Sequence, residues 1–349
     1  MVTCFPFRPP RLPGPGTWRA FLGGLFYEHE IPTNRGRWQM KKPNSAFSPQ
    51  PSAFSNAAAA RFGFRVTPYY RALGLKHEAV RRQWWPDERE MEEGECSGDP
   101  FNEARLEHDA GVRGVVQRFE DRVLVRVTNQ CAVVCRHCTR KGPLGNGTCG
   151  ALEDLDAAVE YVRARPKVRE VLLSGGDALM LGDDAIGRVI GAFASLPQVD
   201  AVRVGTRLPV VLPTRVTRAL SRILGRTKKV WVNTQFNHPA ELTPESERAC
   251  GRLVDAGVPV SSQGVLLAGV NDDAEVLAAL FSGLQRMRVR PYYMFVCDPV
   301  AGVSHFRVEA RRARELERAV SVRLGGLAMP RFVADCPGAK SKVPVGELS

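Results

Sequence analysis

Residues 122–138 read RVLVRVTNQCAVVCRHC and join a short apolar strand to a cysteine-rich loop. The first seven residues are mostly valine and leucine, which favour a β-strand. Three cysteines with the spacing CxxxCxxC follow at once, at Cys131, Cys135 and Cys138. We therefore expect a buried strand whose carboxyl end opens into a loop that carries three thiols.

After this stretch, short apolar runs alternate with amphipathic segments of helix length. The predicted strands are Arg122–Thr128, Glu170–Ser174, Ala201–Gly205, Lys229–Thr234, Pro259–Leu267 and Pro291–Val296. The predicted helices lie near 152–165, 183–195, 214–225, 243–256 and 272–287, and a further helix (309–322) and strand (Phe332–Asp335) follow. This alternation is typical of a parallel α/β sheet, in which ligands bind at the carboxyl ends of the strands. Six strand–helix units are too few for a closed eight-unit barrel, so we expect an α/β fold with a partial, open (β/α)6 barrel.

The chain divides into three predicted regions. Residues 1–115 form an N-terminal, mostly helical region, and its proline-rich first residues are expected to be disordered. Residues 116–297 form the partial barrel, and residues 298–349 form a short C-terminal segment.

The composition is that of a globular protein, because 44% of the 349 residues are hydrophobic and 25% are charged. The formal net charge is +12, but 40 of the 49 basic residues are arginine and they are spread along the chain. We interpret this as the coding bias of a GC-rich genome, which makes nucleic acid an unlikely partner. No apolar run approaches the ~18 residues that a membrane-spanning helix needs, and no secretory signal is visible. We therefore expect a cytoplasmic protein with no membrane partner.

The nine cysteines argue against a disulfide framework, because their number is odd and the compartment is expected to be reducing. Three close thiolates can ligate three irons of a cubane cluster and leave the fourth iron free for another ligand. An open coordination position distinguishes a catalytic metal centre from a closed structural one. The alternatives are three unliganded thiols, or a zinc site completed by His137 without the second pair of ligands that zinc usually has.

Two further elements lie on the predicted strands or at their ends. The second strand runs into Ser174-Gly175-Gly176-Asp177. Glycines let the backbone approach a ligand closely, but a plain turn between strand and helix would have the same composition. Gln263 is a polar residue in an otherwise apolar strand. A buried amide needs partners, which either a ligand or the core can supply.

Lysine is scarce in this chain, with nine residues in all, yet Lys340 and Lys342 lie close together near the C-terminus. Lysine differs from arginine because it can lose its proton and form an imine. The loop therefore carries a candidate nucleophilic amine. The alternative is an ordinary solvated lysine.

The cysteine spacing, in the loop after the first strand, resembles the radical S-adenosylmethionine (SAM) superfamily. The resemblance implies a [4Fe–4S] cluster on the three cysteines, whose open iron binds SAM. One-electron reduction, by a donor such as flavodoxin or ferredoxin, then produces a 5′-deoxyadenosyl radical. The SAM contacts that we assign on this basis are Ser174, Gly175, Gly176, Asp177, Gln235 and Gln263.

A narrower resemblance extends from about Trp38 to Val345. It rests on the segments Cys135-Arg-His-Cys-Thr-Arg140, Ser174-Gly-Gly-Asp-Ala-Leu179, Asn237-His238-Pro239, Arg290-Pro-Tyr-Tyr293 and Ser304-His-Phe-Arg307. These segments are similar to those of the lysine 2,3-aminomutase family, which consists of radical SAM isomerases that also use pyridoxal 5′-phosphate (PLP). We therefore expect the same fold, the same three cofactors and a small amino-acid substrate, and a homo-oligomer is possible.

The family places its PLP lysine after a Pro-Gly-Gly-Gly-Gly run. Pro337-Gly-Ala-Lys-Ser341 stands in that place here, so the resemblance implies that Lys342, and not Lys340, binds PLP. Arg118 and Arg122 match family residues near the PLP phosphate, although either could be an ordinary surface charge.

The resemblance also implies the substrate contacts. Arg140 matches the arginine that pairs with the substrate α-carboxylate, a job that suits a bidentate guanidinium. Asp298 and Asp335 match the two aspartates that hold the distal cation of lysine, whereas relatives that act on glutamate lack this pair. Two carboxylates in one pocket need a cation between them, so we expect a substrate with a basic side chain.

The function implied is a 2,3-aminomutase that converts L-lysine to β-lysine through a 5′-deoxyadenosyl radical. Alternatives are an arginine 2,3-aminomutase, a supplier of β-lysine for modification of a translation factor, and a non-catalytic iron–sulfur protein that binds RNA. Three departures from the family stand out. Gln235 replaces a histidine, Asp273 replaces a cysteine that ligates zinc in some relatives, and the chain ends seven residues after Lys342. We therefore expect no structural zinc.

Overall fold

The computed structural model describes residues 56–92, 98–145 and 149–348. These residues belong to one compact unit, residues 43–349. The expected disorder of the first residues concerns a segment outside the described ranges. The division into three regions at residues 115/116 and 297/298 stays a prediction.

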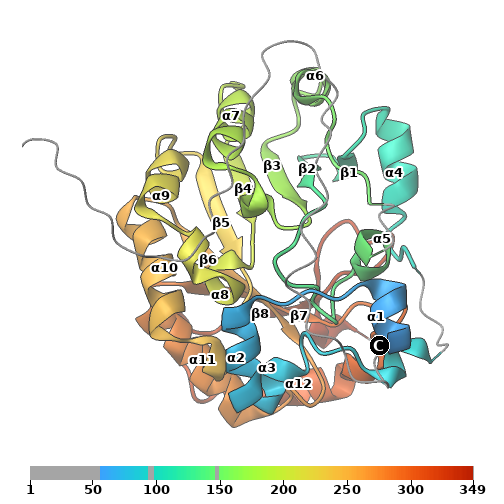
Figure 1. Cartoon of the computed structure of the whole chain (residues 1–349), viewed down its shortest axis with the longest axis vertical. Helices are drawn as coiled ribbons and strands as arrows, with labels where there is room; N and C mark the ends of the chain where they lie inside the picture. Colours follow the sequence, from blue (N-terminus) through green and yellow to red (C-terminus); the bar gives the residue numbers. More distant parts are fainter. Residues whose placement is uncertain (1–55, 93–97, 146–148, 349) are drawn as a thin grey trace, which may run out of the picture. The chain divides into compact units, whose positions relative to one another are not determined.

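A single sheet runs through the described residues, with its strands in sequence order (Figure 1). The strands are β1 (Val115–Phe119), β2 (Arg122–Thr128), β3 (Glu170–Gly175), β4 (Ala201–Gly205), β5 (Val230–Thr234), β6 (Val260–Leu266), β7 (Arg290–Val296), β8 (Arg331–Ala334) and β9 (Val343–Pro344). Neighbouring strands from β2 to β8 are parallel, whereas β1 and β9 pair antiparallel at the two ends. The predicted α/β fold with an open partial barrel is confirmed, and β8 extends it by one more parallel strand.

Helices follow the parallel strands and cover the outer face of the sheet (Figure 1). They are α6 (Leu155–Arg163), α7 (Asp183–Ala194), α8 (Leu208–Val211), α9 (Arg218–Leu224), α10 (Pro244–Asp255), α11 (Ala274–Arg286) and α12 (Ala310–Ser321). Side-chain caps begin several of them, and Asp273 accepts hydrogen bonds from the first turn of α11. The residue that replaces a zinc-binding cysteine of some relatives is therefore a helix cap here. No helix in the described part of the chain is long and apolar enough to cross a membrane.

The core lies between the sheet and these helices. On β3 and β4, Val171, Leu173, Val202 and Val204 are completely buried. The residues between them are less buried and face the inside of the barrel, where the Arg203 guanidinium pairs with a strand neighbour, Glu170, at 3.1 Å. Side chains alternate between the two faces of a strand. The apolar face therefore packs on helices, and the other face lines a polar interior.

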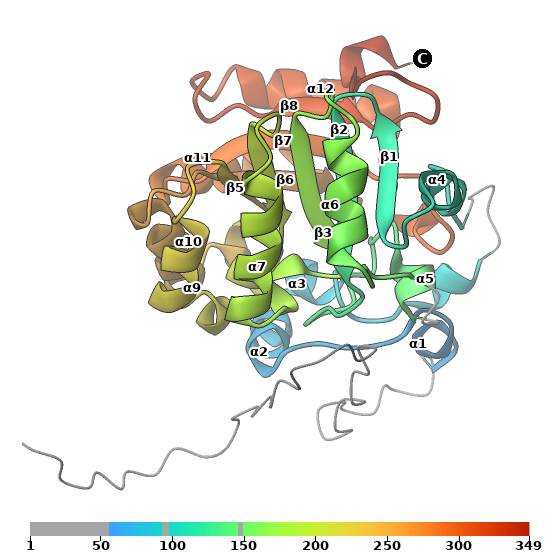
Figure 2. The ribbon, with the colours of Figure 1, turned by 90° about the horizontal axis from the view of Figure 1, so that it is seen from above.

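The N-terminal helices lie at the end of the sheet where the parallel strands finish (Figure 2). They are α1 (Asn56–Phe62), α2 (Pro68–Lys76), α3 (Glu78–Arg81) and the short 3-10 helix η3 (Glu88–Met91). Their connections bond the cysteine loop directly, because the Val134 N–H donates to the Arg65 carbonyl and the Arg136 N–H donates to the Gln83 carbonyl, each at 2.9 Å. The loop is thus held between the barrel and these helices.

Several elements lie outside the predicted alternation: β1, β9, α4 (Glu103–Ala110) and α5 (Lys141–Gly145). The β9 strand is the most consequential. It folds back on β8 with Ala334 opposite Val343. This register places Asp335, the residue that follows β8, opposite Lys342, the residue that precedes β9. A two-residue strand has no sequence period of its own, so only its pairing reveals it.

Candidate active site

The three predicted cluster ligands lie on the loop that leaves β2, and the loop is pressed against the end of β3. Gly175 has φ +110, and a Cβ atom there would strike the carbonyl oxygen of Thr128. A Cβ atom on Gly176 would strike the carbonyl oxygen of Gln130. The Gly176 N–H donates to the Thr128 carbonyl, and the Asp177 N–H donates to the Gln130 carbonyl, both at 2.7 Å. The two glycines therefore allow β3 to touch the cysteine loop.

The electrostatics of the loop suit a cationic cluster. Burial and the neighbouring thiols raise the pKa of Cys131, and the same causes raise the pKa of Cys138 to about 11. Close, buried thiols become favourable thiolates when a positively charged cluster binds them. The Arg207 guanidinium donates to the sulfur of Cys135 at 2.9 Å. The residues present thus fit a [4Fe–4S] cluster.

For the alternative of a zinc site completed by His137, the structure shows where one ring nitrogen of this residue lies. The ring nitrogen Nε2 of His137 lies 3.0 Å from the side-chain nitrogen of Gln235 and 3.4 Å from that of Asn237, so it faces these amides. Burial lowers the pKa of His137, which keeps the ring neutral. Among the described residues, no three His, Cys, Asp or Glu side chains are arranged to hold a single metal ion.

Among the residues assigned to SAM, Gly176, Asp177 and Gln235 contact this loop, and all the assignments stay predictions. Ser174 and Gln263 are half-buried on β3 and β6. Gln235 is bonded to His137, as described above. The carboxylate of Asp177 accepts the Thr206 hydroxyl at 2.6 Å and the Arg207 N–H at 2.6 Å.

Three of the predicted PLP and substrate residues, Lys342, Asp335 and Arg118, meet at the β8–β9 hairpin. The Lys342 ammonium forms an ion pair with Asp335, and the Arg118 guanidinium donates to the other oxygen of Asp335 at 2.6 Å. Burial and the charge of Asp335 raise the pKa of Asp298 to about 7, while Lys342, Arg118 and Arg140 act in the opposite direction. Contacts therefore join Lys342, Arg118 and Asp335 directly, while Asp298 is linked to them through charge. Segments more than two hundred residues apart in the chain contribute to this group.

The surroundings of Lys342 fit an aromatic cofactor. Its ammonium lies 5.9 Å from the ring centre of Phe119 and 5.4 Å from that of Phe295. By contrast, the neighbouring Lys340 is exposed. Arg122 pairs with the exposed Asp121 at 2.9 Å, as an ordinary surface charge would, while it also stacks on Phe119. The residues around Lys342 can thus hold PLP, and the phosphate contacts of the two arginines stay a prediction.

Arg140 has a partner, Glu103, that no sequence pattern predicts. Its guanidinium donates two hydrogen bonds to Glu103, at 2.7 and 2.5 Å, and Arg126 lies 3.9 Å from the same carboxylate. Glu103 begins α4, which is 37 positions before Arg140. The pair orients the arginine through one edge of its planar group and leaves the other edge for a further carboxylate.

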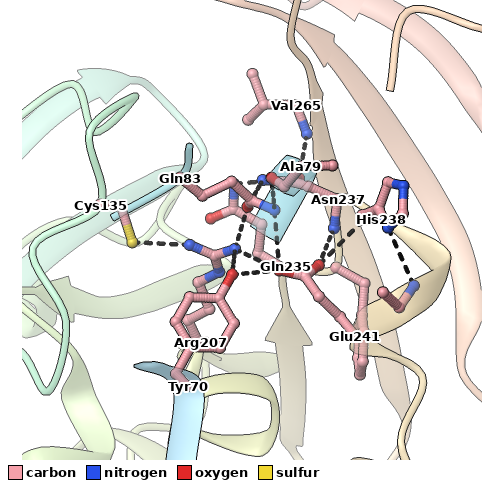
Figure 3. A network of polar contacts seen from close by, with 12 residues as sticks. Tyr70, Ala79, Gln83, Cys135, Arg207, Gln235, Asn237, His238, Glu241 and Val265 are labelled. Carbon is pink, nitrogen blue, oxygen red and sulfur yellow. Dashed lines mark hydrogen bonds and ion pairs between the residues drawn. The ribbon is translucent and has the colours of Figure 1, made fainter. Parts of the chain in front are cut away.

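A second set of residues missed by the sequence reasoning surrounds Arg207, at the carboxyl end of β4 (Figure 3). Arg207 bonds Cys135, Tyr70 and Glu241, and Glu241 is completely buried. The position of Arg207 directly after a parallel strand was the one available signal, because ligand sites form at such ends.

Comparison with known proteins adds independent information. No protein-family model matches the chain. The L-lysine 2,3-aminomutases of Acetoanaerobium sticklandii and Clostridium subterminale are each 42% identical, over 80% of this chain and 68% of their own length. The glutamate 2,3-aminomutase of Clostridioides difficile is 34% identical over 82% of this chain and 68% of its own. A solved structure of Streptococcus suis SuiB bound to S-adenosylmethionine aligns with a TM-score of 0.47 and 12% identity, over 67% of this chain and 53% of that one.

An open parallel barrel with a CxxxCxxC loop after its first parallel strand defines the class of this protein, which is that of the radical SAM enzymes. The relatives at 42% identity cover most of the described residues and share one name. The chain belongs to the lysine 2,3-aminomutase family.

Proposed function

We propose that this protein is a PLP-dependent lysine 2,3-aminomutase, an isomerase that moves the amino group of L-lysine from C2 to C3 and produces β-lysine. The observation that carries the proposal is the ion pair between Lys342 and Asp335, and the effect of both charges on the pKa of Asp298 supports it. The primary ammonium of Lys342 already forms an ion pair with Asp335. Two carboxylates suit the distal ammonium of lysine once Lys342 is engaged with PLP.

The residues of this chain have separable roles in that reaction. Cys131, Cys135 and Cys138 hold the cluster, which, with SAM bound, supplies a carbon-centred radical that removes a hydrogen atom. Lys342 holds PLP, which supplies an aldehyde and a conjugated ring that stabilises an unpaired electron. A small one-electron donor such as flavodoxin or ferredoxin reduces the cluster.

Positioning is the contribution of the protein itself. Asp298 and Asp335 hold the distal end of the substrate, and Arg140, oriented by Glu103, holds its α-carboxylate. Fixing both ends of a flexible amino acid leaves C2 and C3 in one place relative to the radical. A shorter acidic substrate such as glutamate would place a third carboxylate beside the aspartates.

The test is an amino-acid assay on anaerobically reconstituted protein with SAM, PLP and dithionite. We expect conversion of L-lysine to β-lysine, little turnover of L-glutamate, and complete loss of activity in Cys135→Ala, which removes one ligand of the cluster. Offering L-arginine in parallel decides between the two basic substrates. Faster conversion of arginine than of lysine would replace the substrate assignment, and turnover by Cys135→Ala would refute the radical mechanism.

A further inference from the structure

We propose that Arg207 sets the reduction potential of the iron–sulfur cluster, through a hydrogen bond from its guanidinium to the sulfur of Cys135. The inference rests on the proposed function, because it takes the cluster assigned there. Arg207 lies outside the cysteine motif and outside the predicted substrate site. It acts through a ligand of the cluster and is therefore a positioning residue.

The first support is that both terminal nitrogens of the Arg207 guanidinium are held by hydrogen bonds, although its Nε has no partner. One terminal nitrogen of Arg207 donates to Cys135 at 2.9 Å, and the other donates to the Tyr70 hydroxyl and to Glu241, also at 2.9 Å. The backbone N–H of the same residue donates to Asp177 at 2.6 Å. Only 8% of the side chain is exposed. Its direction toward the sulfur is therefore fixed by contacts on the side away from the cluster.

Glu241, the counter-charge, is held just as firmly (Figure 3). One of its oxygens accepts the Gln83 side-chain amide at 3.1 Å, in addition to Tyr70 and Arg207. The other accepts the backbone N–H groups of Asn237, at 2.6 Å, and of the following residue, at 3.1 Å. A buried carboxylate with all its bonds satisfied cannot swing away from its partner. The cation and its counter-charge thus keep a constant distance from the cluster.

The elements that supply this network come from distant parts of the fold. Tyr70 lies on α2, Gln83 follows α3, Arg207 follows β4, and Glu241 ends the short helix after β5. A structural role alone, as the partner of the buried Glu241 carboxylate, would already require a cation at the position of Arg207. The contact with a thiol that ligates iron is the feature that packing alone does not require.

The redox consequence follows from charge. The oxidised [4Fe–4S]2+ cluster takes one electron from a low-potential one-electron donor and becomes [4Fe–4S]1+, with no proton transferred and no bond broken. The added negative charge is stabilised by a fixed cation that donates to a ligating sulfur in a buried, low-dielectric place. Glu241 partly offsets this effect, since its negative charge lies on the far side of the guanidinium.

The opposite signs of these two charges make the test sharp. Wild-type protein and the variants Arg207→Gln and Glu241→Gln are reconstituted anaerobically without SAM. Their clusters are titrated with a redox mediator set while the EPR signal of the reduced cluster is recorded. We expect Arg207→Gln to shift the reduction equilibrium about tenfold toward the oxidised cluster, which is about 59 mV to lower potential for one electron. We expect Glu241→Gln to raise the potential, because the charge of Arg207 is then less compensated.

Arg215→Gln is the matched control. Arg215 is also largely buried and pairs with Asp183 at 2.7 Å, while its other donors bond the backbone carbonyls of Leu179 and Leu181. The same substitution there should leave the potential unchanged.

Two results would overturn this inference and leave the proposed function standing. One is an unchanged potential in Arg207→Gln. The other is a shift of the same sign in Arg207→Gln and Glu241→Gln, which would indicate a packing effect. If Arg207→Gln does not hold a cluster, Glu241→Gln decides, and a potential equal to or below that of the wild type overturns the inference. Wild-type protein that assembles no [4Fe–4S] cluster would overturn the proposed function as well.

Discussion

Lys342 and Lys340 are two residues apart, yet their surroundings differ in a way that decides their chemistry. Lys342 is half-buried, paired with Asp335 and flanked by two aromatic rings, whereas Lys340 is exposed. We expect Lys342→Ala to abolish the absorbance of lysine-bound PLP. We also expect it to lower the activity more than 100-fold. Lys340→Ala, the matched control, should retain both. The opposite pattern in the absorbance spectra would reassign the PLP lysine.

Asp298 gives a pH dependence at the same scale. Burial and the charge of Asp335 raise its pKa to about 7, so its carboxyl group is neutral below that pH and anionic above it. Only the anion attracts the distal ammonium of a basic substrate. We therefore expect kcat/KM for lysine to rise as the pH increases through about 7, mainly through a falling KM.

A comparison with Asp298→Asn tests whether Asp298 causes this rise of kcat/KM with pH. The asparagine variant should have a higher KM at pH 8 and a flatter profile between pH 6 and 8, because its side chain does not titrate. An unaltered rising limb in this variant would assign the titration to another group.

At the scale of elements, the contact between the end of β3 and the cysteine loop depends on Gly176. An added methyl group there would strike the backbone of Gln130, so one of the two segments would have to move. We expect Gly176→Ala to lower the iron content per chain at least severalfold after reconstitution. We expect its melting temperature to fall as well. Iron analysis and thermal unfolding measure both quantities.

Gly191→Ala is the control for that substitution. Gly191 lies inside α7, and nothing stands within 4 Å of the position that its Cβ would take. Alanine favours a helix interior over glycine by roughly 0.5–1 kcal/mol. The variant should keep its iron and unfold at an equal or higher temperature. Iron loss in both variants would point to a general sensitivity of the fold.

At the scale of the whole molecule, one buried ion triad ties three regions together. The carboxylate of Glu90, in η3, accepts from Arg136, in the cysteine loop, at 2.6 Å and from Lys141 at 2.8 Å. Lys141 also donates to the Gly302 carbonyl, beyond β7, at 2.6 Å. All three charged side chains have no exposed surface. Burial lowers the pKa of Lys141 to about 8, and Glu90 opposes that fall.

Removing the shared carboxylate should therefore be costly. Glu90→Gln leaves the buried Arg136 without its counter-charge and lowers the pKa of Lys141 further, and we expect it to lower the free energy of unfolding by about 3–5 kcal/mol. Glu78→Gln, which breaks an exposed pair with Arg81, should cost less than about 1 kcal/mol. Urea titrations of the two variants make the comparison, and equal losses would mean that the triad is not an anchor.

The parts of the fold that could be predicted are those with a local cause. The parallel strands appear in the sequence as apolar runs such as Val202 and Val204, because one face of each packs on helices. The cluster ligands stay a prediction, and it could be made because three thiols on one short loop suffice to hold iron. By contrast, β1 and β9 are short edge strands whose hydrogen bonds come only from pairing with a neighbour.

The sequence by itself therefore determined the class of fold and the family, and it predicted the cysteine ligands, since these depend on periodicity, on motifs and on spacing within a few residues. Only the tertiary structure decided which charges meet. It placed Glu103 on Arg140, 37 positions away, and Arg207 on Cys135, 72 positions away. The physical reason is that a buried charge is stable only beside a partner, and the folding of distant segments, not their order in the chain, brings the partners together.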